Sequence, residues 1–393
     1  MLVFGLTVSP LFSNAQNVYF IDAKTSHVYA DDYRTTPQGG DTIKILSGRT
    51  AGMKFKGFQG DKNTPIIFIN EGGQVNINTS SWGALVFENC KYIKVSGTGD
   101  PNYHYGFKLK AEECGLSFSE YSSNCEVEFI EIEGDEKSEL NKNGTFFGIV
   151  AKKDFHGKPP VPYPVFNNLI IHDTYIHHVA EGMYIGETTS PGMEFSHVKI
   201  YNNVVTNTFR ESVQIANCIK GVEINNNIFL NAGTENLLHQ NNALQIGANS
   251  VANVFDNIIL NSPRFGVIIL GNGDITLNNN YIQNNRGIYI DNRLQVIPNS
   301  SIRIENNYFD QIDDIQVIEN RNEFMNLFIL NNTYNPQIKF LKNVMDSNAS
   351  LVEKNNKPSE ISNLQYKITK GVFQNSSANK KTYQLMGPKS LRE

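Results

Sequence analysis

The sequence repeats one phrase of about 25 residues, in which an apolar strand runs into an asparagine-rich turn. Six copies of this phrase end on Asn203, Asn227, Asn257, Asn280, Asn307 and Asn332. Successive copies are therefore 24, 30, 23, 27 and 25 residues apart. A period of this length is typical of a solenoid, in which each repeat packs only on its neighbours.

The repeats favour β-strands because they are rich in β-branched and aromatic residues and lack helical periodicity. Parallel strands cannot be joined by two-residue turns, and a coil supplies the crossover that each strand needs. Stacked coils would bring the last asparagines together at the ~4.8 Å spacing between strands, where each amide can donate to the next. The sequence therefore predicts an all-β fold, a single parallel β-helix with an asparagine ladder.

A second strand follows each asparagine turn. Its aligned copies give two inward columns, Ile185, Ile215, Ile246, Ile269 and Ile290 beside Met183, Val213, Leu244, Val267 and Ile288. The residue between these columns must point outward, because side chains alternate along a strand. In successive coils this outward row is Tyr184, Gln214, Gln245, Ile268 and Tyr289. Rings and amides on one face suit a sugar chain, although exposed tyrosines without any function are the alternative.

Less regular strand patterns occur from about residue 40, and the strand rhythm is lost after about residue 340. We therefore expect a signal peptide over 1–15, a β-helix over 16–340 and an irregular basic cap over 341–393. The N-terminal run ends in the small residues Ser13-Asn-Ala15 but lacks a basic start, and an ordinary first strand is the alternative. We expect a secreted protein (periplasmic, outer-surface or extracellular), a monomer with no membrane span.

The four cysteines form neither a disulfide framework nor a CxxC motif. Cys114 and Cys125 could pair in an oxidising compartment, whereas Cys90 and Cys218 are expected to be buried thiols.

Charge divides unevenly along the chain. Residues 1–335 hold 24 basic and 35 acidic side chains, whereas residues 336–393 hold 10 basic and 4 acidic ones. An acidic body argues against nucleic acid as a partner. It also disfavours a strongly anionic polysaccharide unless a local cationic patch or a metal compensates.

Glu181 and Glu211 occupy the same position in adjacent coils, so their carboxylates could lie about 5 Å apart. A retaining glycosidase needs two carboxylates at about that separation, one as nucleophile and one as acid and base. Strand parity places both residues on the inward side, so a structural ion pair with Arg210 is the alternative.

Other candidates surround this pair in the sequence. The predicted catalytic residues are Glu181, Glu211, His177 and Arg210. The predicted substrate-binding residues are Tyr184, Gln214, Gln245, Arg264, Arg286, Tyr289, Asp291, His178 and His239. His177 and His178 could equally be turn residues.

A lyase would use the same region differently. A metal or an arginine would neutralise a uronate carboxylate while a basic side chain removes the C5 proton. Arg210, Arg264, Arg286, His177 and Tyr184 could serve these roles. No cofactor is required, but Glu181 and Glu211 could hold Ca²⁺ through their oxygens.

Over residues 17–340 the chain resembles the secreted right-handed parallel β-helix repeat proteins of Bacteroidetes-type bacteria. The segments that carry the resemblance are 40–45, 63–68, 95–99, 105–109 and 176–186. The resemblance implies a right-handed helix and a superfamily that includes polysaccharide lyases, glycoside hydrolases, epimerases and non-catalytic adhesins.

The reaction-specific motifs of that superfamily are missing. Ser212 and Gln214 stand where one lyase group has two carboxylates, and Lys220 is displaced from the lyase lysine. The polygalacturonase set of paired aspartates with an HG and an RIK motif does not occur together in this chain, which has no RIK. We therefore expect an enzyme that depolymerises a polysaccharide, with hydrolysis favoured over elimination, and a non-catalytic glycan-binding protein as the alternative.

Overall fold

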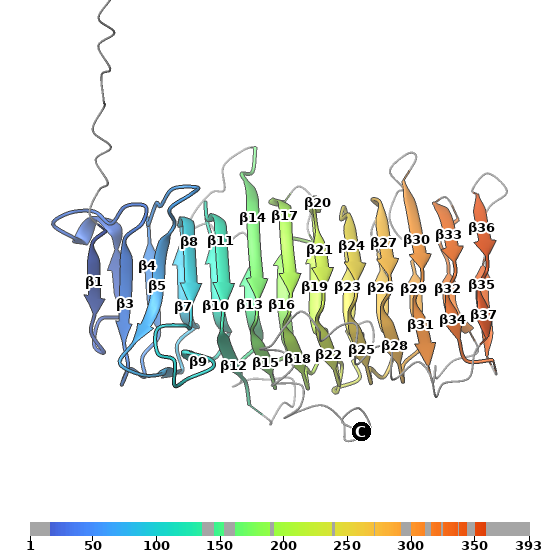
Figure 1. Cartoon of the computed structure of the whole chain (residues 1–393), viewed down its shortest axis with the longest axis horizontal. Coiled ribbons are helices and arrows are strands. Elements are labelled where there is room, and N and C mark those ends of the chain that lie inside the picture. Colours follow the sequence, from blue (N-terminus) through green and yellow to red (C-terminus); the bar gives the residue numbers. More distant parts are fainter. Residues whose placement is uncertain are drawn as a thin grey trace, which may run out of the picture.

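Three parallel β-sheets form the walls of an elongated β-helix, with coils stacked from the N-terminal to the C-terminal end (Figure 1). The computed structural model describes residues 16–135, 145–152, 162–188, 192–237, 240–270, 272–291, 300–310, 316–323, 325–336, 338–343 and 350–358. The predicted fold class, all-β with a single parallel β-helix and an asparagine ladder, is confirmed.

Each coil contributes one strand to each sheet over most of the helix. The first sheet contains β1 (Val18–Ile21), β3 (Thr42–Leu46), β5 (Ile66–Glu71), β8 (Lys91–Ser96), β11 (Ser123–Glu128), β14 (Val165–His172), β17 (Glu194–Tyr201), β20 (Cys218–Lys220), β21 (Glu223–Asn225), β24 (Ala252–Phe255), β27 (Ile275–Asn278), β30 (Ser301–Glu305), β33 (Asn326–Leu330) and β36 (Leu351–Lys354). The second sheet contains β2 (His27–Tyr29), β4 (Met53–Lys56), β7 (Gly83–Glu88), β10 (Cys114–Ser119), β13 (Phe147–Ala151), β16 (Glu181–Gly186), β19 (Val213–Ala216), β23 (Leu244–Ile246), β26 (Val267–Ile269), β29 (Ile288–Ile290), β32 (Gln316–Asn320) and β35 (Lys339–Asn343). The third sheet contains β6 (Val75–Asn78), β9 (Phe107–Lys110), β12 (Ile130–Glu133), β15 (Tyr175–His177), β18 (Val204–Thr206), β22 (Ile228–Leu230), β25 (Ile258–Leu260), β28 (Tyr281–Gln283), β31 (Tyr308–Asp310), β34 (Thr333–Tyr334) and β37 (Lys357–Pro358). A short 3₁₀ helix, η1 (Ala30–Asp32), follows β2.

The predicted asparagine ladder lies at the turns between the first and third sheets. Each side-chain amide donates to the side-chain oxygen of the next asparagine at 2.9 to 3.1 Å, and the same oxygen also accepts the backbone N–H. Thr174 begins this row and Asn356 ends it. The residue before the ladder position has positive φ, as in Asn202 and Asn226 (57° and 53°), a conformation that asparagine tolerates.

A second asparagine row, which the repeat did not predict, lies at the turns between the third and second sheets. Asn231 donates to Asn207 at 2.9 Å, Asn261 to Asn231 at 3.0 Å, and Asn284 to Asn261 at 2.8 Å. All four residues have positive φ. Donation in this row runs toward the N-terminal end, opposite to the direction of the buried ladder.

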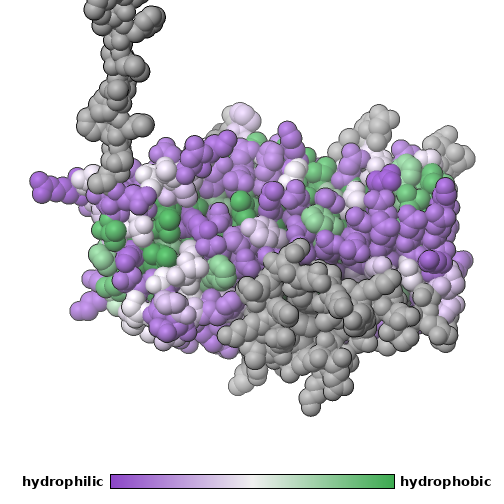
Figure 2. All heavy atoms as spheres, in the orientation of Figure 1, coloured by the Kyte–Doolittle hydropathy of each residue, from purple (hydrophilic) through white to green (hydrophobic). Residues whose placement is uncertain are grey.

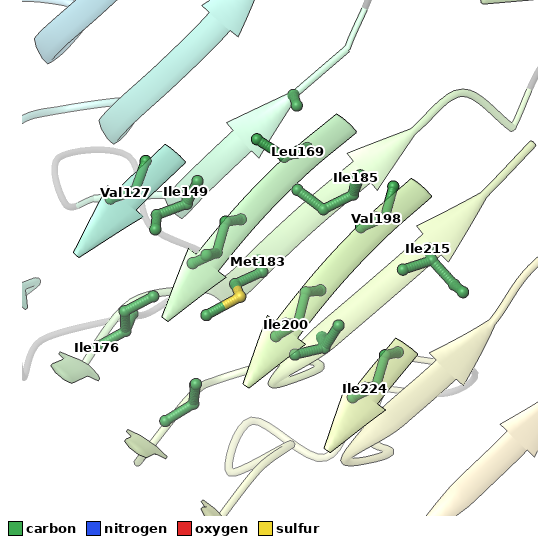
Figure 3. Packing of buried hydrophobic residues seen from close by; sticks show 14 of the residues in the cluster. Val127, Ile149, Leu169, Ile176, Met183, Ile185, Val198, Ile200, Ile215 and Ile224 are labelled. Carbon is green, nitrogen blue, oxygen red and sulfur yellow. The ribbon is translucent and has the colours of Figure 1, made fainter. Parts of the chain in front are cut away.

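Apolar side chains from the three sheets fill the interior. Every residue of the two predicted inward columns is buried, with an exposed fraction of 0 or 1%. Figure 3 shows Met183, Ile185 and Ile215 of the second sheet pointing into the same core as Ile176 of the third and Ile200 of the first. Removing these surfaces from water is the main stabilising contribution to such a core.

The strands continue past the predicted end of the helix at residue 340. β36 pairs with β33, and β37 pairs with β34. All residues of β36 and β37 are exposed, so these last strands lack the alternation of buried and exposed residues seen in earlier coils. Residues 1–15 and 359–393, which hold the predicted signal peptide and most of the predicted cap, lie outside the described residues.

All four cysteines are free and buried, so the possible Cys114–Cys125 disulfide is not formed. Cys114 lies on β10 of the second sheet and Cys125 on β11 of the first, and they belong to separate apolar clusters. The buried thiols predicted at Cys90 and Cys218 are confirmed.

The surface in view is mostly hydrophilic, with small hydrophobic groups over the N-terminal coils and others toward the C-terminal end (Figure 2). In the part of the chain that the structure describes, no helix has the length and apolarity needed to cross a bilayer.

Replacing one rung of the ladder should destabilise the helix strongly. Asn257→Ala removes the donor to Asn280 and to the backbone oxygen of Ile224, and the acceptor for Asn227. The partners stay buried without hydrogen bonds, so we expect a loss of about 3 kcal/mol or more. Urea denaturation followed by circular dichroism measures this loss. The exposed Asn253→Ala on neighbouring β24 is the matched control, with an expected change within about 0.5 kcal/mol.

Candidate functional site

Successive strands of the second sheet have a small residue at the same position near their start. This residue turns the side chain before it outward. A Cβ added to Gly148 or Gly182 would lie 2.5 Å from Ile176 or Val205, both core residues, so these glycines face the interior. The next residue in each strand, such as Met183, also faces the interior. Two consecutive inward positions break the simple alternation, as in a β-bulge.

Glu181 therefore points outward, and the parity prediction that placed it inward is wrong. Phe147, its register partner on β13, packs against Val150 and Tyr184 in a cluster separate from the core. The negative charge of Glu181 also acts on Tyr184, a member of the outward row. Ser212 takes the glycine position in the next coil, and Glu211 precedes it as Glu181 precedes Gly182.

The two glutamates lie side by side on adjacent coils. Met183 pairs with Val213, and the N–H of Gly182 donates to the backbone oxygen of Glu211 at 3.0 Å. Both side chains are buried, with residue exposures of 3% for Glu181 and 0% for Glu211. The predicted adjacency of this pair therefore holds in the backbone register.

Arg210 contacts only one member of the pair directly. Its Nη1 lies 3.6 Å from Oε1 of Glu181, and its guanidinium carbon lies 4.6 Å from the ring centroid of Phe146. The N–H of Arg210 also donates to the backbone oxygen of Ala180, which fixes the start of this side chain beside Glu181.

Burial raises the pKa of both carboxyl groups. The pKa of Glu181 rises to about 7, because loss of hydration outweighs the favourable charges of Arg210 and Lys152. The pKa of Glu211 rises to about 8, first through burial and then through the like charge of Glu181. The pair is thus set to exchange protons near neutral pH, which is unusual for carboxyl groups.

Several polar atoms around this pair have no hydrogen-bond partner. They are Glu181 Oε2, both carboxylate oxygens of Glu211, Arg210 Nε, Ser212 Oγ and Asn241 Oδ1. The Asn242 amide lies beside the Glu211 carboxyl and lowers its pKa, although the two are not aligned for a full hydrogen bond. Buried polar groups are nearly always paired in folded proteins, and unpaired ones are costly. Their concentration around Glu181 and Glu211 indicates a site built for a group other than this chain's own side chains.

Lys152 connects this site to a cavity of about 500 Å³. Its Nζ lies 5.3 Å from the ring centroid of Phe147, and its charge lowers the pKa of Glu181. Lys152 also lines the cavity, together with His27, Lys54, Trp82 and Glu88. The cavity lies over the outward side of β2, β4, β7 and β10, on the N-terminal side of the carboxyl pair.

The predicted outward row has the expected register but is less exposed than predicted. Tyr184 pairs with Gln214, Gln214 with Gln245, Gln245 with Ile268 and Ile268 with Tyr289. Gln214, Gln245 and Ile268 expose only 7, 8 and 4% of their residue surface. These side chains point away from the core but have little contact with water, because other side chains pack against this face of the second sheet. One example is the Phe265 ring, stacked 4.9 Å from the Tyr289 ring.

The arginines and Asp291 lie farther along the same sheet. Arg264 continues the column of Arg210, and its guanidinium carbon lies 5.5 Å from the Phe265 ring. Arg286 lies opposite Phe265 in the following coil, on the Glu181 column. Asp291 follows β29 and is buried. These residues share a sheet with the glutamates but lie two or more coils away from Glu211.

The structure does not bring the histidines to this site. His177 lies on the third sheet, where it contacts Glu131 at 3.4 Å and stacks on Tyr175 at 4.2 Å. His178 follows it in a positive-φ turn, with its Nδ1 2.9 Å from that of His177. His239 lies outside the described residues.

Two groups of acidic residues and histidine have the composition of a metal site, Glu126, Glu128 and His172, and Glu131, Glu133 and His177. Lysines already neutralise both groups. Lys94 contacts Glu126 at 2.6 Å and Glu128 at 2.9 Å, and Lys108 makes the equivalent pairs in the other group. Their hydrogen bonds are satisfied within the chain, so we assign them a structural role.

Free carboxylate oxygens instead gather at Glu181 and Glu211. Oδ1 of Asn241 is also unpaired, and oxygen is the ligand atom that Ca²⁺ prefers. The chemistry of these atoms agrees with the Ca²⁺ that the sequence suggested for Glu181 and Glu211, whereas the two histidine-containing groups are neutralised by lysines.

Sequence reasoning missed Lys152, Trp82 and the cavity. One signal was available, because Phe147-Gly-Ile-Val-Ala151 has the same pattern as Glu181-Gly-Met-Tyr-Ile185 one coil later. Recognising this copy would have extended the glycine column to Gly148 and placed Phe147 level with Glu181, with Lys152 directly after the far end of the same strand. The cavity itself joins segments that lie up to 126 positions apart and that share no pattern.

No protein-family model matches the chain, and no curated protein matches it in sequence. Among solved structures, it is similar to an alginate lyase from a Paenibacillus species, with 13% identity, a TM-score of 0.47, and coverage of 84% of this chain and 99% of that one. It is also similar to a GH136 lacto-N-biosidase from Eubacterium ramulus, with 12% identity, a TM-score of 0.48, and coverage of 88% and 68%. A third is a mannuronic acid specific family 6 polysaccharide lyase from human gut microbiota, with 14% identity, a TM-score of 0.40, and coverage of 90% and 94%.

The raised pKa of Glu211 predicts a pH-dependent stability. Between pH 4.5, the ordinary pKa of a glutamate, and about pH 8, Glu211 keeps a proton in the folded protein that it has lost in the unfolded chain. The stability from this neutral carboxyl is complete below pH 4.5 and is lost as pH rises through about 8. Glu211→Gln should therefore raise Tm relative to wild type, by a margin that grows across this window. Thermal unfolding at several pH values measures it.

The control for this experiment is Glu194→Gln, an exposed glutamate on β17. Its Tm difference from wild type should stay constant across the window. An equally constant difference for Glu211→Gln would contradict the raised pKa.

Proposed function

We propose that this chain is an enzyme that depolymerises a polysaccharide by hydrolysis, with Glu181 and Glu211 as its two catalytic carboxyl groups. The observation that carries the proposal is the pair itself, buried on neighbouring coils with unpaired oxygens and raised pKa values. Neighbouring strands lie about 4.8 Å apart. Retaining glycosidases place their carboxyl groups about 5–5.5 Å apart, which matches positions on adjacent strands.

Arg210 assigns the roles within the pair. Its guanidinium lies beside Glu181 and favours the ionised form, so Glu181 is the nucleophile. Glu211 has the higher pKa and no ion pair of its own, which suits a proton donor. Different surroundings of two carboxyl groups are the usual basis for such a division of roles.

The reaction then proceeds in two steps. The Glu181 carboxylate attacks the anomeric carbon while the Glu211 carboxyl gives its proton to the departing glycosidic oxygen, leaving an ester on Glu181. The Glu211 carboxylate next takes a proton from water, the hydroxyl oxygen attacks the anomeric carbon, and Glu181 is released as carboxylate. Substrate reaches the pair from the side of Lys152, which lines the cavity and acts on Glu181.

One observation favours elimination as a second candidate. Three carboxylate oxygens of the pair and Oδ1 of Asn241 are buried without partners and fit Ca²⁺. A bound Ca²⁺ would neutralise a uronate carboxylate. Tyr184, whose ring lies 5.4 Å from that of Phe147 opposite Glu181, would then take the C5 proton.

Product analysis separates these reactions. The purified protein is incubated with neutral and uronate-containing polysaccharides, with Ca²⁺ or with EDTA, and both reducing ends and the ultraviolet absorbance of unsaturated sugars are followed. Hydrolysis gives reducing ends alone, insensitive to EDTA. Unsaturated ends that require Ca²⁺ would replace hydrolysis by elimination, and glycan binding without any product would indicate a non-catalytic protein.

Removing either carboxyl group should abolish hydrolysis. Glu181→Gln and Glu211→Gln are expected to lower kcat at least about 100-fold, because each loses a group that acts in the transition state. Formate added to Glu181→Ala should restore product formation by replacing the missing nucleophile, an effect that a structural role would not produce. Glu194→Gln is the matched control and should keep full activity. Wild-type rates in both glutamine variants would contradict the assignment.

Hydrolysis should have a bell-shaped pH profile with its maximum between about 7 and 8, because Glu181 must be ionised and Glu211 protonated. Initial rates across this range measure the two limbs. Arg210→Met should move the acid limb to higher pH by removing the charge that favours ionised Glu181. An unmoved acid limb in this variant would count against Glu181 as the nucleophile.

Secretion, a monomeric state and a lack of nucleic-acid binding remain predictions from the sequence. We propose them together with the function.

A further inference from the structure

We infer that the cavity around Trp82 is a second sugar-binding site, which holds a pyranose ring of the same polysaccharide chain several units away from the bond that is cleaved. This inference rests on the proposed function. It adds that the substrate lies lengthwise along the helix axis and that recognition depends on its chain length.

Trp82 provides the surface that a sugar ring would stack on. It is the single tryptophan of the sequence, it precedes β7, and 43% of its surface is exposed within the cavity lining. An indole offers a large apolar face at low conformational cost, which suits the apolar face of a pyranose. A cavity of about 500 Å³ also falls within the usual range for small-ligand sites.

A charged pair at the base of the cavity supplies the polar contacts. Glu88 is 5% exposed, and its Oε1 lies 2.6 Å from Nζ of Lys54, which also lines the cavity. Lys56 contacts the other carboxylate oxygen at 3.4 Å. A carboxylate held by two ammonium groups can accept from one sugar hydroxyl while a lysine donates to its neighbour, which fixes the orientation of the ring.

The cavity and the carboxyl pair lie along the same sheet. β7, β10, β13 and β16 are successive neighbours in the second sheet, so Trp82 and Glu181 are three coils apart, about 14 Å along the axis. Lys152 joins the two ends, because it lines the cavity and contacts the ring of Phe147 opposite Glu181. A single sugar ring cannot fill both places, so the substrate that fits is an oligomer.

Tryptophan fluorescence tests this inference directly because Trp82 is the only indole. The Glu211→Gln variant, which binds without cleaving, is titrated with cellohexaose and with hexagalacturonate, and with glucose and galacturonate at equal concentrations. Comparing the two hexasaccharides shows whether the site binds a neutral or an acidic sugar. One hexasaccharide should change the emission at concentrations at least about tenfold below those of its monosaccharide.

Trp82→Ala and the control Tyr103→Ala are compared by KM on the same hexasaccharide and on a disaccharide. Tyr103 is 44% exposed and lies outside the cavity lining. Trp82→Ala should raise KM for the hexasaccharide about tenfold, as truncation of an aromatic anchor does, and leave disaccharide hydrolysis unchanged. Tyr103→Ala should match wild type on both.

The failures are distinguishable. Hydrolysis that Trp82→Ala leaves unchanged on every chain length, or hexasaccharide binding with no change in emission, overturns the second site while the proposed function stands. Length-dependent emission changes without any hydrolysis support the second site and overturn the proposed function. Binding of neither hexasaccharide overturns the inference for both sugar classes.

Discussion

The spacing between parallel strands governs this molecule, because every row of side chains along the helix axis repeats at the same interval. At about 4.8 Å, identical side chains in successive coils are in contact range. Asparagines at that interval hydrogen-bond in a buried ladder, and phenylalanines stack, as Phe55 does on Phe87 with ring centroids 5.1 Å apart. The same interval places like charges side by side when two glutamates occupy one column. Stability and the candidate chemistry both follow from what occupies each column.

Charged columns are treated in two opposite ways. On the first sheet, Glu126 and Glu128 face Lys94 and a histidine, and side-chain hydrogen bonds with His172 and Lys94 lower the pKa of Glu126 to about 2. On the second sheet, Glu181 and Glu211 share one arginine and have raised pKa values. The first arrangement stabilises the fold, whereas the second costs stability. Carboxyl groups with raised pKa values of this kind cluster at functional sites.

The period, the ladder and the inward columns were predictable, because each depends on a pattern that recurs in every coil. The spacing between strands then brings the equivalent residues of successive coils into contact. The outward direction of Glu181 was not, since Gly182 adds an inward position that simple alternation ignores. Burial of Gln214 and Gln245 was also beyond the sequence, because alternation gives the direction of a side chain and says nothing of what covers it. The cavity escaped prediction for a further reason. Trp82 and Lys152 meet only because coils of unequal length stack in register.

The buried ladder also limits how such a chain can vary in length. Each rung accepts from one neighbour and donates to the next, so an insertion inside a coil is tolerated only where it bulges outward and leaves the rung in place. The interval of 30 residues between Asn227 and Asn257, against 23 between Asn257 and Asn280, shows that loops absorb such differences. Growth along the axis must come instead in whole coils, each adding one rung and one strand to every sheet. A groove along the second sheet would therefore lengthen by one coil at a time. The number of sugar units it could hold would change only when a whole coil is added or removed.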